Sequence, residues 1–212
     1  MLPPASPAAA LTSMKRKPPD GVFQLDAFVK QCIRACRHDE KTSIKRLRSV
    51  YSRAIEHSPE AVRRAIPNTG PDEVLLHEDD DCTIYIVRVP AGIKYAPHDH
   101  GMVAVVGVFE GIEVNDYFKR VSIDTCQVPS MQTEAVETGS VAVLDADVVH
   151  AISSRGSTRS QALHVYLGNL GATDRKLFHP KTGKALPFTM QNYFSNASPP
   201  QPVPDGHDQA VY

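Results

Sequence analysis

The stretch GIKYAPHDHGMVAVVGVFEG, from Gly92 to Gly111, places a His-Asp-His pair at the start of a valine-rich run. In an extended strand, residues i and i+2 point to the same face, so His98 and His100 can bind one metal ion together. Asp99 then faces the other way, toward solvent or toward a group that supports the site. The stretch therefore predicts β-structure that carries a metal site.

The chain that follows a cluster of turn residues at 67–71 has the pattern of short β-strands. Runs rich in Val, Ile, Tyr and Phe are bounded by Gly, Pro, Asp or Ser, with no helical period between them, at 82–89, 103–109, 112–118, 140–144, 148–152 and 162–167. Such a pattern predicts a mainly β fold, either a sandwich or a barrel. A third histidine, His150, opens one of these strands. The histidines in polar or loop-like surroundings are expected at the surface: His38, His57, His77, His179 and His207.

The N-terminal part of the chain has a different period. From Phe23 to Ala65, apolar residues recur at helical spacing, which predicts two or three amphipathic helices. We expect four segments: a disordered tail at 1–20, a helical segment packed on the barrel at 21–66, the barrel itself at 70–194, and a second disordered tail, rich in proline, at 195–212.

Composition excludes several classes of partner. The chain has 212 residues, 42% of them hydrophobic, and a formal net charge of -1, so no excess of basic charge is available for nucleic acid or an anionic membrane. Its apolar runs are too short to span a bilayer. Cys32 and Cys36 are spaced for neither a redox Cys-x-x-Cys motif nor a zinc knuckle, which suggests free thiols and a cytoplasmic protein. We expect a monomer or a weak homo-oligomer.

The spacing of glycines and histidines resembles the two motifs of the cupin superfamily. The first motif reads Gly, five residues, His-x-His, three residues, a Glu position, six residues and Gly, and it is matched except that Ala104 stands at the Glu position. The second motif is matched at Gly139 and His150, but Asp145 and Asp147 replace its Pro and Gly, and Ser154 replaces its Asn. The resemblance implies a cupin-type double-stranded β-helix, or jelly-roll, barrel in which His98, His100 and His150 bind the metal.

Alanine at the Glu position leaves a neutral three-histidine face with open coordination positions, which favours an anionic donor such as a thiolate beside dioxygen. The segment from Ala162 to Ala172 also resembles the strand on which thiol dioxygenases carry a Ser-x-His-x-Tyr triad, with His164 and Tyr166 matching and Ala162 replacing the serine. His164 and Tyr166 share a strand face, so the imidazole can hold the phenol near the metal. The alternative is an ordinary core Tyr-His pair.

Arg175 stands where the mercaptopropionate branch of that family has an arginine that pairs with the substrate carboxylate. The alternative is a surface ion pair of Arg175 with Asp174 or Glu137. Upstream, the family has Gln or Arg as a second substrate contact. This chain offers Asp72 or Glu73, which would repel a carboxylate and suit an amine.

The resemblance, which covers residues 73 to 195, implies an iron(II)-dependent thiol dioxygenase of the cysteine dioxygenase and 3-mercaptopropionate dioxygenase type. Such an enzyme converts a small thiol and O2 to the sulfinate, with Tyr166 and His164 as catalytic residues and Arg175 binding substrate. Two other functions stay open: a cupin that binds metal or ligand without turnover, and a cupin dioxygenase or isomerase that acts on a non-thiol substrate.

Overall fold

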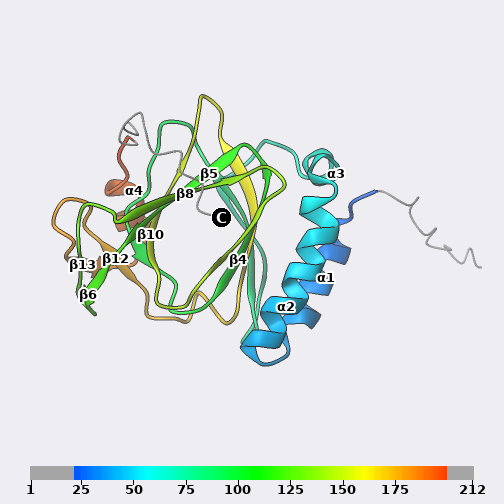
Figure 1. Ribbon diagram of the computed structural model, residues 1–212, viewed down its shortest axis with the longest axis horizontal. Helices are drawn as coiled ribbons and strands as arrows, with labels where there is room; N and C mark the ends of the chain where they lie inside the picture. The colour runs from blue at the N-terminus through cyan, green and yellow to red at the C-terminus, as the bar shows by residue number, and fades with distance from the viewer. Residues whose placement is uncertain (1–21, 200–212) are drawn as a thin grey trace, which may run out of the picture.

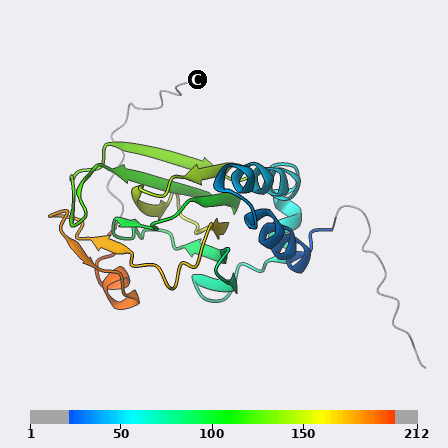
Figure 2. The same ribbon diagram turned by 90° about the horizontal axis from the view of Figure 1, so that it is seen from below.

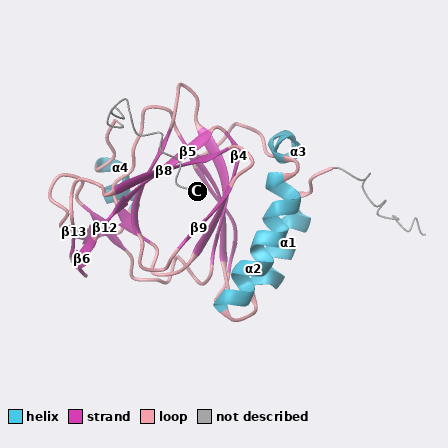
Figure 3. Ribbon diagram, in the orientation of Figure 1, coloured by secondary structure: helices cyan, strands magenta, loops and turns pink. Residues whose placement is uncertain are grey.

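Two antiparallel β-sheets face each other and form a barrel, and three helices cover one side of it (Figures 1 and 3). The computed structural model describes residues 22–199. The prediction of a mainly β, double-stranded β-helix barrel with N-terminal helices is confirmed.

The first sheet has the order β1-β2-β11-β4-β9 and lies under the helices. Its strands are β1 (Glu73–Glu78), β2 (Thr83–Val89), β11 (Ser160–Tyr166), β4 (Ala104–Glu110) and β9 (Val141–Leu144). The second sheet has the order β13-β12-β3-β10-β5-β8. Its strands are β13 (Ala185–Pro187), β12 (Lys176–Phe178), β3 (His98–Asp99), β10 (Val149–Ser154), β5 (Ile112–Phe118) and β8 (Gln132–Glu137). A separate ribbon pairs β6 (Arg120–Ser122) with β7 (Thr125–Cys126).

Gly111 carries the chain from the first sheet to the second, between β4 and β5. Its φ is +75°, which L side chains rarely adopt, and a Cβ there would lie 3.0 Å from the carbonyl oxygen of Arg159 and 3.0 Å from the Cα of Ser160. The last glycine of the first cupin-like motif is thus required by the backbone at this crossing.

The helical layer consists of α1 (Leu25–Cys36), α2 (Glu40–Tyr51) and α3 (Pro59–Ala65), with a π-helical turn, η1 (Ser52–Glu56), continuing α2. Figure 2 shows these helices together at one end of the molecule. Asp39 caps α2 by accepting a hydrogen bond from the backbone N–H of Thr42 at 3.1 Å. The buried stripe of each helix packs on the first sheet, as its apolar period predicts.

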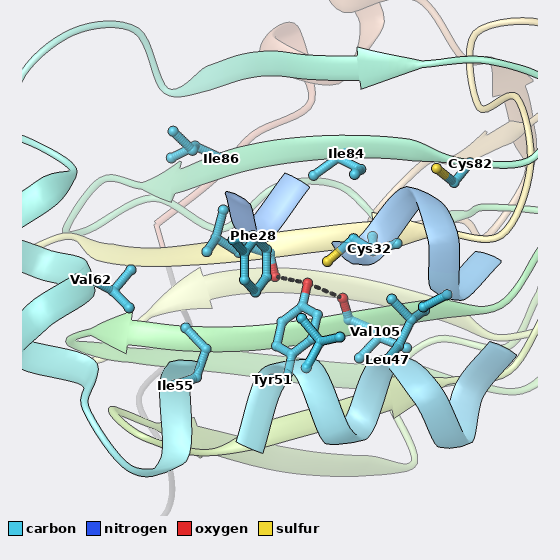
Figure 4. Close-up of a cluster of buried hydrophobic side chains, with 14 of the residues drawn as sticks. Phe28, Cys32, Leu47, Tyr51, Ile55, Val62, Cys82, Ile84, Ile86 and Val105 are labelled. Atoms are coloured by element: carbon cyan, nitrogen blue, oxygen red, sulfur yellow. Dashed lines mark hydrogen bonds between the residues drawn. The ribbon is translucent and has the colours of Figure 1, made fainter. Parts of the chain in front are cut away.

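Tyr51 lies at the centre of the core between the helices and the first sheet (Figure 4). Its hydroxyl lies 3.0 Å from the carbonyl oxygen of Leu163 and 3.2 Å from that of Val105. The ring lies directly against Gly107, where a Cβ would come within 2.4 Å of the Tyr51 ring. The absence of a side chain at Gly107 therefore allows Tyr51 of α2 to pack directly on β4.

Strand β11 is buried on both faces. Leu163 and Val165 belong to the core under the helices, whereas Ala162 and Tyr166 belong to a cluster inside the barrel. This alternation follows from the period of two along a strand. One strand thus joins the helical layer to the interior in which the candidate site lies.

The structure adds elements that the sequence patterns did not predict, among them β1, β8, the short strands β6, β7, β12 and β13, and a helix α4 (Met190–Ser195). The histidine pair was expected to begin the valine-rich strand, but His98 lies in the separate two-residue strand β3 of the other sheet, and His100 follows it. The predicted tail from 195 begins too early, because Lys94 and Ser198 exchange backbone hydrogen bonds of 2.6 and 2.8 Å. The tails expected at 1–20 and 200–212 lie outside the described residues. No helix in residues 22–199 is long and apolar enough to cross a membrane. The four cysteines are buried and unpaired.

Candidate metal centre and adjoining cavity

The three histidines of the two cupin-like motifs converge inside the barrel. His98 in β3 is the cross-strand partner of His150 in β10, and His100 follows directly after β3. All three side chains are buried, and one ring nitrogen from each lies within 4.8 Å of those from the other two. The Nε2 atoms of His100 and His150 are 3.1 Å apart. The structure therefore brings together a group that could hold a metal ion.

Hydrogen bonds on the outer side of the rings orient two of these histidines. His98 Nδ1 lies 3.0 Å from the carbonyl oxygen of Ala96, and His150 Nδ1 lies 2.7 Å from Oδ1 of Asn115. Both partners are acceptors, so each Nδ1 carries the proton and each Nε2 keeps its lone pair for the interior. His100 Nδ1 is buried and has no hydrogen-bond partner within residues 22–199.

Electrostatics keep the rings neutral. Burial lowers the pKa of His98 to about 4. Burial, followed by the neighbouring imidazoles, lowers the pKa of both His100 and His150. Neutral imidazoles are the form that binds metals, so the donor set fits a divalent cation.

Asp99 supports the site from the other face of β3, as the alternation predicted. Its side chain is buried, and it accepts hydrogen bonds from Arg120 Nη2 at 2.6 Å and from the backbone N–H of Lys176 at 2.7 Å. The Asp99 carboxylate therefore joins the two-residue strand β3 to β12 and β6. It is not one of the groups that could bind the metal ion with the three histidines.

Ala104 lies inside the barrel, opposite Tyr166 in the pairing of β4 with β11. The described residues thus supply no carboxylate from the position at which many metal cupins carry glutamate. The donor set is three neutral nitrogens.

Tyr166 and His164 form the pair expected from their spacing. The Tyr166 hydroxyl lies 3.1 Å from His164 Nδ1, and the Tyr166 ring packs edge-on against His100 with centroids 4.9 Å apart. Burial raises the pKa of Tyr166, so the phenol keeps its proton and can donate it in a hydrogen bond.

Glu113 supplies the partner that the absent serine left open. His164 Nε2 lies 3.3 Å from Glu113 Oε2, and Asn115 Nδ2 donates to Glu113 Oε1 at 3.4 Å. Because Asn115 also binds His150, one chain of contacts runs from Tyr166 through His164, Glu113 and Asn115 to a candidate metal ligand.

Sequence reasoning missed Glu113 and Asn115. A signal was present, since residues 113 and 115 are polar at i and i+2 of a predicted strand and so share one face. Both are fully buried, and a carboxylate so placed needs partners.

The cavity beside the three histidines is small, about 80 Å³, well under the ~300–1,000 Å³ of pockets that bind drug-sized ligands. Its walls include the three histidines, His164, Tyr166, Glu73, Arg175, Phe188 and Tyr193. Phe188 and Tyr193, from the segment around α4, were not predicted as site residues.

Arg175 lies at this cavity and stacks on Phe188, with its guanidinium carbon 3.9 Å from the ring centroid. Within residues 22–199 it makes no ion pair with Asp174 or Glu137, the alternative role considered for it. Of the two upstream acids, Glu73 lines the cavity. Asp72 does not, and its Oδ1 lies 4.0 Å from Nη1 of Arg159. Burial raises the pKa of Glu73, and the electrostatic interactions of its carboxylate with His164 and Arg175 oppose that rise.

No protein-family model and no curated protein matches the sequence. Solved structures with a similar fold include a conserved double-stranded β-helix protein from Klebsiella pneumoniae, with 14% identity and a TM-score of 0.41, covering 55% of this chain and 92% of that one. A cupin family protein from Methanocaldococcus jannaschii has 11% identity and a TM-score of 0.39, covering 50% and 89%. A variant of Bacillus subtilis oxalate decarboxylase has 14% identity and a TM-score of 0.35, covering 42% and 22%. These similarities concern the fold alone.

Proposed function

We propose that the chain is an iron(II)-dependent thiol dioxygenase that converts a small thiol and O2 to the sulfinate. The observation that carries this proposal is the single small cavity lined by three neutral imidazoles and by a hydrogen-bonded Tyr166–His164 pair. The reaction balances without a further reductant, because one RSH and one O2 give one RSO2H.

The donor set supports a metal that must also accept two exogenous groups. Three nitrogens from His98, His100 and His150 would occupy one face of the ion and leave the other positions to the reactants. A ferrous ion held there would supply the redox chemistry that joins dioxygen to a thiol sulfur.

Tyr166, His164 and Glu113 give the protein a proton donor at the cavity. A proton on His164 Nε2 points at the Glu113 carboxylate, which fixes the ring. With Nδ1 unprotonated, the Tyr166 hydroxyl donates to it. With Nδ1 protonated, that bond reverses, and the phenol proton is free to point at the oxygen or sulfur of the reactants.

The charges at the wall favour a substrate with two charged groups. Arg175 suits a carboxylate, which it can bind through two parallel N–H bonds. Glu73 at the same cavity suits an ammonium group. Cysteine carries both groups, 3-mercaptopropionate lacks the amine, and cysteamine lacks the acid. We therefore expect cysteine, or an amino-acid thiol of its size, to be preferred.

Oxygen uptake and sulfinate formation by the iron-loaded protein test the proposal, with cysteine, 3-mercaptopropionate and cysteamine as substrates. We expect thiol-dependent uptake, fastest with cysteine, and a strong loss in Tyr166→Phe. Tyr117→Phe is the matched control, because the Tyr117 hydroxyl donates to the exposed Glu134 and Tyr117 is not among the residues that line the cavity. In Glu73→Gln, the ratio of cysteine to 3-mercaptopropionate turnover should fall.

Metal analysis of protein purified without added metal provides a second test. Iron should predominate and should be absent from His98→Ala. A protein that binds iron and thiol but consumes no oxygen with any of the three substrates would be a non-catalytic cupin, and the dioxygenase proposal would be abandoned. If zinc were the only metal found in the purified protein, that result would also count against the dioxygenase proposal.

A further inference from the structure

A second group of metal-binding side chains lies at the turn between β1 and β2. His77, Asp79 and Cys82 each offer one ligand atom, and these atoms lie within 4.8 Å of one another. Nitrogen, carboxylate oxygen and thiolate sulfur are the three ligand types that Zn²⁺ takes in proteins. None of the three residues lines the cavity of the three-histidine site.

The local backbone fixes two of these residues. Asp79 Oδ1 accepts hydrogen bonds of 2.9 Å from the backbone N–H groups of Asp81 and Cys82, which leaves Oδ2 directed toward His77. A register shift in the β1–β2 pairing between Leu75 and His77 changes the direction of the His77 side chain. Sequence reasoning had treated His77 as an ordinary surface residue, but it is partly buried beside Asp79.

The His77 side chain has a buried nitrogen atom that lacks a well-directed hydrogen bond within residues 22–199. This atom, Nε2, lies 2.9 Å from Asp79 Oδ2. Buried polar atoms are rarely left so. A cation between the imidazole, the carboxylate and the fully buried sulfur of Cys82 would satisfy all three.

The charge of Asp79 is not neutralised by a buried lysine or arginine among the described residues. The only described cation paired with Asp79 besides His77 is Arg37, at 3.7 Å, which is mostly exposed and also pairs with Asp81 at 3.1 Å.

We propose that His77, Asp79 and Cys82 bind zinc(II) at the turn between β1 and β2. One nitrogen, one oxygen and one sulfur ligand leave a fourth position of the tetrahedral ion that a water molecule would fill. On binding, the Cys82 thiol releases its proton to solvent and becomes a thiolate. The site's role would be to fix this turn, apart from any reaction at the three histidines.

Cobalt(II), which replaces zinc and is coloured, tests this proposal in the full chain stripped of metal. The three-histidine cavity has no cysteine in its walls, so a thiolate-to-cobalt charge-transfer band reports the second site alone. The titration is done in a His98→Ala, His150→Ala background, which leaves only the proposed site. We expect one equivalent of cobalt with this band, and its displacement by zinc.

In that background, His77→Ala and Asp79→Asn should each weaken cobalt binding at least tenfold, and Cys82→Ser should abolish the band. Cys82 is fully buried and its replacement could unfold the chain, so the partly exposed His77 carries the test. His57→Ala, which changes an exposed histidine at the end of η1 outside the proposed site, is the control and should leave the band unchanged. Absence of the band, or a band that persists at full affinity in His77→Ala and Asp79→Asn, would overturn the proposal.

In the same His98→Ala, His150→Ala background, zinc should also raise the thermal midpoint and should leave that of the added His77→Ala variant unmoved, because only a ligand that binds the folded state stabilises it. An equal shift in both proteins would assign the effect to another site and count against this one. All of these measurements are independent of whether the protein oxidises thiols.

Discussion

Replacing Glu113 by glutamine removes one charge from the contacts behind Tyr166 while keeping the size of the side chain. Glu113 and His164 are both buried, with 3.3 Å between Oε2 and Nε2, so solvent screens their interaction little. A hydrogen bond to a charged group contributes about 1.5–3 kcal/mol, against about 0.5–1.5 kcal/mol for a neutral one. The change therefore removes about 1–1.5 kcal/mol of the support that the His164 ring receives from Glu113.

If that support acts at the rate-limiting step, kcat should fall about tenfold, since about 1.4 kcal/mol corresponds to a factor of ten. KM for the thiol should change little, because Glu113 does not line the cavity. The assay is steady-state oxygen uptake, normalised to the iron content of each preparation. Normalisation is needed because Asn115, the other partner of Glu113, also contacts His150.

Glu134→Gln is the matched control, since it makes the same chemical change at an exposed carboxylate on β8. It should leave kcat unchanged. Wild-type kcat and an unaltered pH profile in iron-loaded Glu113→Gln would refute the role given to Glu113. A loss of rate that merely follows a loss of iron would do the same.

Three further predictions concern the core and the candidate site. Gly107→Ala should lower the free energy of unfolding by about 1–3 kcal/mol in urea titrations, because the new methyl group meets the Tyr51 ring and Ile55; an unchanged midpoint would show that α2 can shift freely. Tyr166→Phe should reduce kcat about 10²-fold or more, as expected for loss of a positioned proton donor, and should leave metal content unchanged by metal analysis. In metal-free protein, the lowered pKa of His98 means that the unfolded chain binds more protons than the folded one between about pH 6.5 and 4. The contribution of this histidine to the free energy of unfolding is therefore complete above pH 6.5 and is lost as the pH falls toward 4. Urea midpoints measured across that range would show the loss. A midpoint that rose as the pH fell from 6.5 to 4 would contradict it.

The parts of the fold that sequence predicts well are those with a local period. The helices of residues 25–65 and the strands β2, β4, β5 and β11 each fall close to a run of clear helical or strand pattern. Gly111 is predictable for a similar reason, because a glycine between two valine-rich runs indicates a turn. That His98 and His100 can approach one ion follows from their i, i+2 spacing in extended chain.

Features that depend on distant pairing could not be predicted in this way. β3 has two residues and no period of its own; it exists because His98 and Asp99 pair with β10. Phe188 and Tyr193 reach the cavity because the chain returns past the barrel after β12, which no local pattern encodes. The role of Glu113 depends on His164, 51 residues away in sequence.

Strand β11 has a consequence for protein engineering. Its residues alternate between two environments: Leu163 and Val165 pack beneath the helices, while His164 and Tyr166 line the cavity. Selecting variants with new specificity can therefore be confined to the cavity-facing positions and their neighbours across the barrel. A combinatorial library that leaves Leu163 and Val165 fixed should keep most of its members folded, whereas one that randomises the whole strand would lose most of them before any activity could be measured.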